Sequence, residues 1–451
     1  MKQIGLRAII IFCISIIYLL SFSMTKAATD DWQERDVLGF SDETTKVHSF
    51  SIDNDGNIYV VYSIDDPTGE ILPFPKAKMY DGTSWTELGS GFISDKSGGQ
   101  FIVRYDDSSE RLYVGFITID GVIHIYEYLD EKWQALTTAG RLLRIDPQYI
   151  YYDFQVMSDG SLVIAYVDIE EDGKITSKVY TDGQWIALGE RGFTEVTANY
   201  ISLLVDRNNQ YVYAAVIVER SNLEVWRYSS NSGWEMTDDS GFESEYPLWV
   251  RLEMGNGDRP ILIYMDTGLE WKTVGMIYNN ETWEYMEPHP FSPMMIKTFS
   301  VVMDSDGWPV VFFNDSDYEN RITSMRYNGE TWIEMGQRGF TKESSNIVFA
   351  GMDEDNNPFV LLPDSRQDGH ILIMAYGEFQ AENTTAEDEE STDVTATTDL
   401  SEKSNASQSE TSEDNSSSGY IVVILIAVVV LVVIVILFIV VKRRRKDQKP
   451  E

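Results

Sequence analysis

Short apolar runs alternate with polar turns along residues 28–379. Between residues 152 and 188, the segments 152–157, 161–167, 175–181 and 184–188 have the length and the β-branched and aromatic content of strands. Asp-Gly pairs at 159–160 and 182–183 separate them, and such pairs favour hairpins because they accept positive φ. The segment 161–167 is almost wholly apolar, which predicts a strand covered on both faces. Helical periodicity is absent, so the pattern predicts an all-β fold of four-stranded units.

A unit of about 50 residues repeats through this region, which is the length of one propeller blade. Seven tryptophans recur at intervals of 48 to 53 residues: Trp32, Trp85, Trp133, Trp185, Trp234, Trp283 and Trp332. Seven tyrosines mark the same unit, mostly five residues before a tryptophan: Tyr80, Tyr128, Tyr180, Tyr228, Tyr278, Tyr327 and Tyr376. Trp32 has no tyrosine before it and Tyr376 has no tryptophan after it, so these two are expected to complete one blade.

These positions predict a seven-bladed β-propeller, residues 28–379, in which an N-terminal strand around Trp32 closes the last blade. Residues 345–376 would supply the three inner strands of that blade. The Trp, Tyr and Phe series is expected to pack between blades, since ligand sites do not recur sevenfold at packing positions. Its phenylalanines belong to Gly-Phe pairs after most tryptophans: Gly39-Phe40, Gly91-Phe92, Gly192-Phe193, Gly241-Phe242 and Gly339-Phe340.

Two apolar segments flank the repeats. Residues 1–27 have the basic, apolar and small-residue order of a cleaved secretory signal peptide; an uncleaved N-terminal anchor is the alternative. Residues 420–441 carry no charge and are long enough for one transmembrane α-helix. The basic cluster 442–446 predicts that the tail, 442–451, is cytoplasmic. We therefore expect a single-pass protein of the cell membrane with its propeller at the cell surface.

The segment between propeller and membrane, residues 380–419, is rich in Ser, Thr, Asn, Asp and Glu. Such a composition cannot bury a core, so it predicts a disordered acidic stalk. Asn-X-Ser/Thr sequons predict a glycoprotein and lie both in the propeller and in the stalk: Asn280, Asn314, Asn383, Asn405 and Asn415.

Net charge and cysteine content limit the classes of partner and of catalytic or metal site that the chain can have. The formal net charge is −38, and the region outside the predicted signal and tail is more acidic still because the tail is basic. This excess of acid excludes nucleic acid as a partner and favours cationic or basic ones, although solubility alone also accounts for it. Cys13 is the chain's one cysteine and belongs to the predicted signal peptide. A cysteine nucleophile, a thiolate metal site and disulfides are therefore excluded from the mature chain.

The sequences YDGTSW (residues 80–85) and YNGETW (residues 327–332) carry a family resemblance. They resemble kelch-type propeller repeats, and look still more like a broad set of secreted prokaryotic propellers with the same Tyr, turn, Trp and Gly-Phe pattern. The resemblance covers residues 30–379. The chain lacks the paired glycines of kelch repeats and the Asp-box of sialidases. The resemblance implies the fold and little about function, since propellers host both binding and catalysis.

An acid stands at or near the end of the second strand of every predicted blade: Asp65, Asp120, Asp168, Glu219, Asp266, Asp315 and Asp364. In propellers generally, the loops after these strands share one face with the crossings between blades, around the mouth of the central channel. The acids are therefore expected to form a carboxylate collar there. Three interpretations stay open: each acid hydrogen-bonds its own turn, the acids attract basic partners, or some of them hold a hard cation such as Ca²⁺.

The leading hypothesis is a membrane-anchored extracellular binding or adhesion protein whose protein or glycan ligand the sequence does not identify. One alternative is an ectoenzyme that acts on extracellular glycans through two carboxylates at the propeller mouth. Another is a structural component of the cell envelope. No catalytic residue or required cofactor is assigned, and Ca²⁺ is the one candidate ion. A pair of acids buried in the channel would favour the enzyme, and an exposed apolar patch beside the acids would favour a binding surface.

Overall fold

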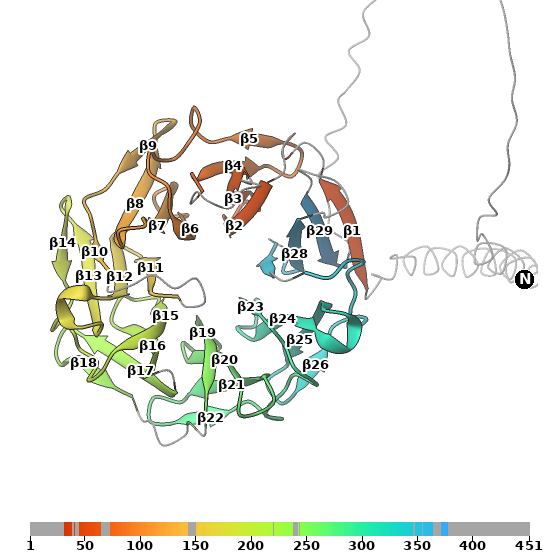
Figure 1. Cartoon of the computed structure of the whole chain (residues 1–451). Coiled ribbons are helices and arrows are strands. Elements are labelled where there is room, and N and C mark those ends of the chain that lie inside the picture. Colours follow the sequence, from red (N-terminus) through yellow and green to blue (C-terminus); the bar gives the residue numbers. More distant parts are fainter. Residues whose placement is uncertain are drawn as a thin grey trace, which may run out of the picture. The chain divides into compact units, whose positions relative to one another are not determined.

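The computed structural model describes residues 31–37, 40, 45–64, 73–142, 150–219, 221–237, 242, 244–345, 348–353, 355–363 and 371–377. Within these ranges the chain forms seven antiparallel sheets arranged as a ring (Figure 1). The prediction of an all-β, seven-bladed propeller is thus confirmed. The predicted signal peptide, stalk, transmembrane helix and tail lie outside the described residues. Among the residues that are described, no helix has the length and apolar character needed to cross a bilayer.

The strands of each blade are given in order from the centre of the ring outward. Blade 1 has β2 (Thr45–Ile52), β3 (Ile58–Ile64), β4 (Lys76–Tyr80) and β5 (Trp85–Glu87). Blade 2 has β6 (Gly99–Asp106), β7 (Arg111–Ile117), β8 (Val122–Leu129) and β9 (Lys132–Ala135), and β10 (Gly140–Arg141) also pairs with β8. Blade 3 has β11 (Tyr152–Val156), β12 (Leu162–Val167), β13 (Ile175–Thr181) and β14 (Gln184–Ala187). Blade 4 has β15 (Ala198–Val205), β16 (Val212–Val218), β17 (Asn222–Ser229) and β18 (Gly233–Met236).

The remaining blades follow the same plan. Blade 5 has β19 (Pro247–Met254), β20 (Pro260–Asp266), β21 (Lys272–Tyr278) and β22 (Trp283–Tyr285). Blade 6 has β23 (Phe299–Met303), β24 (Pro309–Asp315), β25 (Arg321–Tyr327) and β26 (Trp332–Glu334). Blade 7 has β27 (Phe349–Met352), β28 (Pro358–Pro363), β29 (Ile371–Tyr376) and, as its outer strand, β1 (Trp32–Val37).

Ring closure joins the two ends of the propeller as predicted. Strand β1 pairs antiparallel with β29, and Trp32 lies directly opposite Tyr376 (Figure 1). The Trp32 indole donates a hydrogen bond to the Met335 carbonyl of blade 6 at 2.9 Å and stacks on Phe340 with centroids 4.0 Å apart. Trp32 therefore joins the N-terminal strand to blade 7 by strand pairing and to blade 6 by its indole hydrogen bond.

The outer hairpins repeat this arrangement. In every blade the predicted tyrosine and tryptophan are direct cross-strand partners. Most of the tryptophans also donate from the indole N–H to the preceding blade, as Trp133 does to the Leu88 carbonyl. The second strands are covered on both faces, and every residue of β12, β16, β20 and β24 is buried. The aromatic series is therefore packing, as the sequence predicted.

One member of the Gly-Phe series departs from that prediction. Phe92 is 56% exposed, whereas the next residue, Ile93, is buried. The backbone N–H of Ile93 donates to Pro75, which is the bond that Phe193 makes to Ile175 in blade 3. The Gly-Phe pair after blade 1 stands one residue closer to its tryptophan than in the other blades, so Ile93 takes the packing position that the sequence pattern assigned to Phe92.

Candidate functional site

The loops between second and third strands meet the crossings between blades on one face of the ring, here named the crossing face. In blade 3 the Phe193 N–H donates to the Ile175 carbonyl and the Ala198 N–H donates to the Gly173 carbonyl. The turns between first and second strands lie at the other end of the blades, on the turn face. The sequence-based expectation that loops and crossings share a face is met by these contacts.

The predicted collar acids do not form a uniform ring on this face. Strand register puts Asp168, Asp266 and Asp315 at one equivalent position, directly after six buried residues of the second strand. Thr118 and Val218 occupy that position in blades 2 and 4. Asp120 and Glu219 lie further along their loops and are exposed, and Asp65 and Asp364 fall outside the described residues.

Asp168 is bonded within its own blade. Its carboxylate accepts hydrogen bonds from the Glu170 backbone N–H and from Arg191, and begins a short 3-10 turn, η1 (Ile169–Glu171). Burial alone would raise the pKa of this carboxyl, but the bonds from Arg191, Glu170 and Thr176 more than offset it and hold the pKa below its usual value. Asp168 is therefore a charged group with its partners inside the protein.

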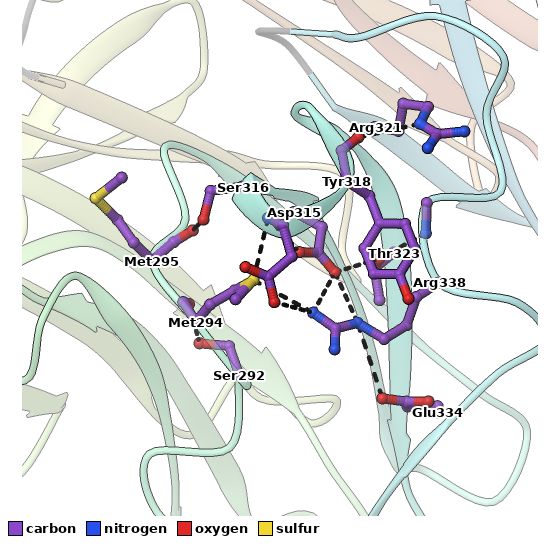
Figure 2. A network of polar contacts seen from close by, with 12 residues as sticks. Ser292, Met294, Met295, Asp315, Ser316, Tyr318, Arg321, Thr323, Glu334 and Arg338 are labelled. Carbon is purple, nitrogen blue, oxygen red and sulfur yellow. Dashed lines mark hydrogen bonds and ion pairs between the residues drawn. The ribbon is translucent and has the colours of Figure 1, made fainter.

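Asp315 repeats this arrangement three blades away. It is fully buried, caps the turn η2 (Ser316–Tyr318), and accepts from Thr323 and from Arg338 at 2.8 Å (Figure 2). The arginine follows the same rule in both blades, because Arg191 and Arg338 each precede the Gly-Phe pair of the crossing. In these two blades the interpretation that the acid bonds its own turn is supported by the contacts.

Asp266 has fewer partners than its two equivalents. Its Oδ1 accepts from the Gly268 backbone N–H at 2.7 Å. Its Oδ2 is buried without a hydrogen-bond partner among the described residues. A carboxylate oxygen in that state is costly to bury, so Asp266 stands apart from the other acids chemically.

Exposed apolar side chains are distributed unevenly over the described residues. Three lie on the outer strands, namely Ile186, Met236 and Ile333. None of the large ones lies on the described turn face, and the rest lie at strand ends, loops and crossings of the crossing face: Ile64, Phe92, Ile119, Ile169, Tyr246, Trp271 and Met295. One face of the ring therefore carries most of the large exposed apolar side chains of the described residues, and such a surface beside acids is typical of a binding face.

A cavity of about 500 Å³ occupies the centre of the ring and is lined by the first strands of all seven blades. Arg104 bridges blades 2 and 3 there, donating to the Phe154 carbonyl and to Asp153 at 3.1 Å. Asp153 in turn accepts from the Leu203 N–H of blade 4. These bonds satisfy backbone groups at the inner edges of blades 3 and 4.

Two further charged groups share this cavity. Arg251 donates to the Val250 carbonyl, and Glu253 lies two residues along the same strand. Burial raises the pKa of the Glu253 carboxyl to about 7, although Arg104 and Arg251 favour its charged form. Asp153 and Glu253 thus place two acids in the channel, an arrangement that favours the enzyme hypothesis.

No collar acid that the structure describes lines this cavity. In the same residues, no three acidic or imidazole side chains gather into a group that could hold a metal ion. The turns at Asp53 and Asp304 are closed by their own backbone, since each carboxylate accepts from the N–H four residues later. Asn314 is fully buried and bonded to Ser345, so its sequon is closed to glycosylation and that expectation was wrong.

Sequence reasoning missed the arginines and the channel charges. The recurrence of Arg-Gly-Phe at 191–193 and 338–340 was a usable signal for the first. The channel charges could be found only by knowing which first-strand residues face the channel. Simple alternation does not give this, because the β-bulges in β6 and β19 shift which side chains face the channel.

Comparison with known proteins places the fold. The chain is similar to the BP39L lectin from Burkholderia pseudomallei, at 11% sequence identity and a TM-score of 0.51, over 73% of this chain and 95% of that one. It is also similar to a PL25 polysaccharide lyase, an ulvan lyase bound to -[GlcA(1-4)Rha3S]-, at 11% identity and a TM-score of 0.50, over 75% and 95% of the two chains. No family model and no curated protein matches the sequence, and kelch membership is not confirmed.

Proposed function

We propose that this chain is an extracellular glycan-binding protein that presents the crossing face of its propeller to the ligand. The observation that carries the proposal is the concentration of exposed apolar and aromatic side chains on that face, next to carboxylates. Sugars offer apolar ring faces to aromatic side chains, and their hydroxyl groups donate to carboxylate oxygens. The similarity to a lectin and to a polysaccharide lyase supports a glycan over a protein ligand.

Display at the cell surface is part of the same proposal. The signal-like segment 1–27, the acidic segment 380–419 and the apolar segment 420–441 would carry the propeller outside the cell and hold it to the membrane. Under this proposal the propeller acts in adhesion, because it joins the membrane that carries it to a glycan on a neighbouring surface.

The test is binding of the purified chain to an array of neutral, acidic and basic glycans. We expect binding to one class above background. The double variant Phe92→Ala/Trp271→Ala, which removes two exposed aromatic side chains from the crossing face, should lose it. Ile186→Ala is the matched control, since Ile186 is 49% exposed on an outer strand. A chain that binds no glycan, or a double variant that binds like the control, would overturn the proposal and leave a structural role in the cell envelope.

A glycan-cleaving ectoenzyme is the second candidate, favoured by the two acids in the channel. A carboxyl whose pKa lies near 7 can donate a proton at neutral pH, and such values are typical of general acids. Incubation of the chain with the glycans it binds, followed by chromatography of the products, tests this candidate. Cleavage abolished by Glu253→Gln would establish it, and intact glycans would exclude it.

A further inference from the structure

Blades 3, 5 and 6 can be compared residue by residue at the crossing face. Equivalent backbone bonds align their crossings: Phe193 N–H to Ile175, Phe291 N–H to Thr273, and Phe340 N–H to Ile322. In that alignment the arginines of blades 3 and 6 correspond to His289 in blade 5. An aspartate stands at the equivalent position in all three blades, but in blade 5 a histidine stands where the other two blades have an arginine.

His289 does not take the place of the arginine. Its ring stacks on Tyr285 with centroids 3.8 Å apart, and its Nδ1 lies 3.0 Å from a carboxylate oxygen of Glu287. Asp266 is 1% exposed, and its Oδ2 is left without a hydrogen-bond partner in the described part of the chain. The carboxylate that pairs with a guanidinium in blades 3 and 6 therefore has no such group here.

The loop beside Asp266 carries a second departure. Blades 3 and 6 place Gly173 and Asn320 at the left-handed position that ends this loop, and these residues suit it. Blade 5 places Trp271 there, at φ 62°, which is an outlier for a bulky side chain. Strain of this kind is retained mainly at functional sites. Its effect is to hold an indole 44% exposed on the crossing face.

Aromatic side chains lie on both sides of the acid. Pro247 and Lys272 are the cross-strand partners of Asp266. Trp271 directly precedes one of them and Tyr246, 57% exposed, directly precedes the other. The two aromatic residues therefore lie at the crossing-face ends of the two strands that pair with the Asp266 strand, one on each side of it.

Two acids approach the backbone at Gly268. A Cβ on this glycine would lie 2.9 Å from the Glu245 Cβ, 3.1 Å from Asp266 Oδ1 and 3.2 Å from a carboxylate oxygen of Glu245, so the position has no room for a side chain. Asp266 and Glu245 therefore lie close together beside bare backbone, and Glu245 and Gly268 are exposed. A cation that bridges the two carboxylates must be small and must donate hydrogen bonds.

We propose that blade 5 holds the ligand site of the propeller and takes a glycan residue that bears a protonated primary amine. The ammonium group supplies to Asp266 and Glu245 the positive charge that Arg191 and Arg338 supply in the other blades. Trp271 and Tyr246 contact the apolar ring faces. The inference rests on the proposed glycan-binding function and adds to it the sugar chemistry and the blade.

The charge of the chain agrees with such a ligand. A net charge of −38 attracts cationic ligands and repels anionic ones, so acidic glycans are disfavoured before any contact forms. Neutral sugars would leave the charge of the Asp266 carboxylate uncompensated, because hydroxyl groups donate hydrogen bonds without bringing charge. A protonated amine supplies both the hydrogen bonds and the positive charge.

Calorimetry on the purified full chain with glucosamine oligomers, and with N-acetylglucosamine oligomers of the same length, tests the proposal. The two ligands share a sugar ring and differ in whether its nitrogen is a protonated amine or a neutral acetamide. We expect the glucosamine oligomer to bind at least about tenfold more tightly, and Asp266→Asn to remove that preference. Asp315→Asn is the control, because Asp315 is equivalent in position and already paired with Arg338; its affinity should match that of the wild type.

A second variant keeps the test decisive if Asp266→Asn does not fold. His289→Arg/Pro290→Gly rebuilds the Arg-Gly-Phe crossing of blades 3 and 6. It should raise the melting temperature and reduce glucosamine binding at least about tenfold, since an internal guanidinium would occupy the site. A structural role for Asp266 alone would give the rise in melting temperature without the loss of binding, and would overturn the proposal.

The remaining outcomes separate the two proposals. Equal binding of both oligomers with no effect of Asp266→Asn refutes the blade 5 site and leaves glycan binding standing. Binding of oligolysine in place of glucosamine oligomers, sensitive to Asp266→Asn, refutes the sugar and assigns the site to a basic peptide. No binding to any glycan on the array refutes both proposals.

Discussion

The outer edge of the propeller is uniform, whereas its inner edge differs from blade to blade. At the outer edge every blade sets a tyrosine opposite a tryptophan, and Trp133, Trp234 and Trp332 donate to equivalent carbonyls of the preceding blade. At the inner edge Ser49 accepts from one neighbouring N–H, Asp153 from another, and Arg104 donates to a carbonyl. The repeated Tyr–Trp pairs thus hold the blades together around the ring, and the residues that differ between blades provide the chemistry of the channel and of the crossing face.

Removal of the closing tryptophan is the strongest way to break the outer pattern. Trp32→Ala should cost about 3–5 kcal/mol of unfolding free energy, because the buried indole, its bond to Met335 and its stacking on Phe340 are all lost. Trp185→Ala, at the same position of a blade that needs no closure and on a half-buried side chain, should cost about half as much. Urea unfolding followed by fluorescence measures both. Equal costs would show that closure adds nothing to the outer pattern.

Arg338 tests the internal ion pairs of blades 3 and 6. Arg338→Met keeps much of the side-chain volume but leaves the fully buried carboxylate of Asp315 without its cation (Figure 2). Such a loss costs about 3 kcal/mol. Arg207→Met is the control, because its pair with Asp258 is exposed and should be worth less than about 1 kcal/mol. Similar unfolding free energies for the two variants would contradict the distinction drawn between these blades and blade 5.

Glu253 gives the inner edge a pH dependence. Its pKa is raised from 4.5 to about 7, so between these values the folded chain binds more protons than the unfolded one. Stability from this group is complete below pH 4.5 and is lost as the pH rises to about 7. The unfolding free energy of Glu253→Gln should therefore rise relative to that of the wild type as the pH increases over this window, by up to about 3 kcal/mol. Melting temperatures of both proteins at pH 4.5 and 7.5 measure it, and a constant difference would refute the raised pKa.

The same contrast explains how much could be predicted from the sequence. The outer hairpin is local: Tyr327 and Trp332 are five residues apart, so spacing alone gave the number of blades and the role of Trp32. Arg104 and Asp153 lie 49 residues apart and meet only because the bulged strand β6 and the neighbouring strand β11 adopt a particular register. The pattern of one chain does not encode that register. Phe92 was misassigned because its Gly-Phe pair stands one residue closer to the tryptophan than in the other blades, so the next residue, Ile93, is the one buried.

Asp266 shows where repeat reasoning can go further than it did. The sequence placed an acid at this position in several blades and treated them alike. Once the register aligns the crossings, His289 in place of an arginine separates one acid from its equivalents. The signal was present in the sequence as a broken repeat, and the physical reason to weigh it is that a buried carboxylate requires a partner.

Ser202 offers the finest test of the inner edge. Its buried hydroxyl accepts a hydrogen bond at 3.0 Å from the Leu252 N–H, an inner-edge group of the next blade. Ser202→Ala leaves that N–H unpaired and should cost about 1 kcal/mol of unfolding free energy. Ser229→Ala is the control, because that hydroxyl bonds only within an exposed outer turn. If both variants unfold at the same urea concentration, water in the channel replaces the hydroxyl, and the inner-edge bonds orient side chains without adding stability.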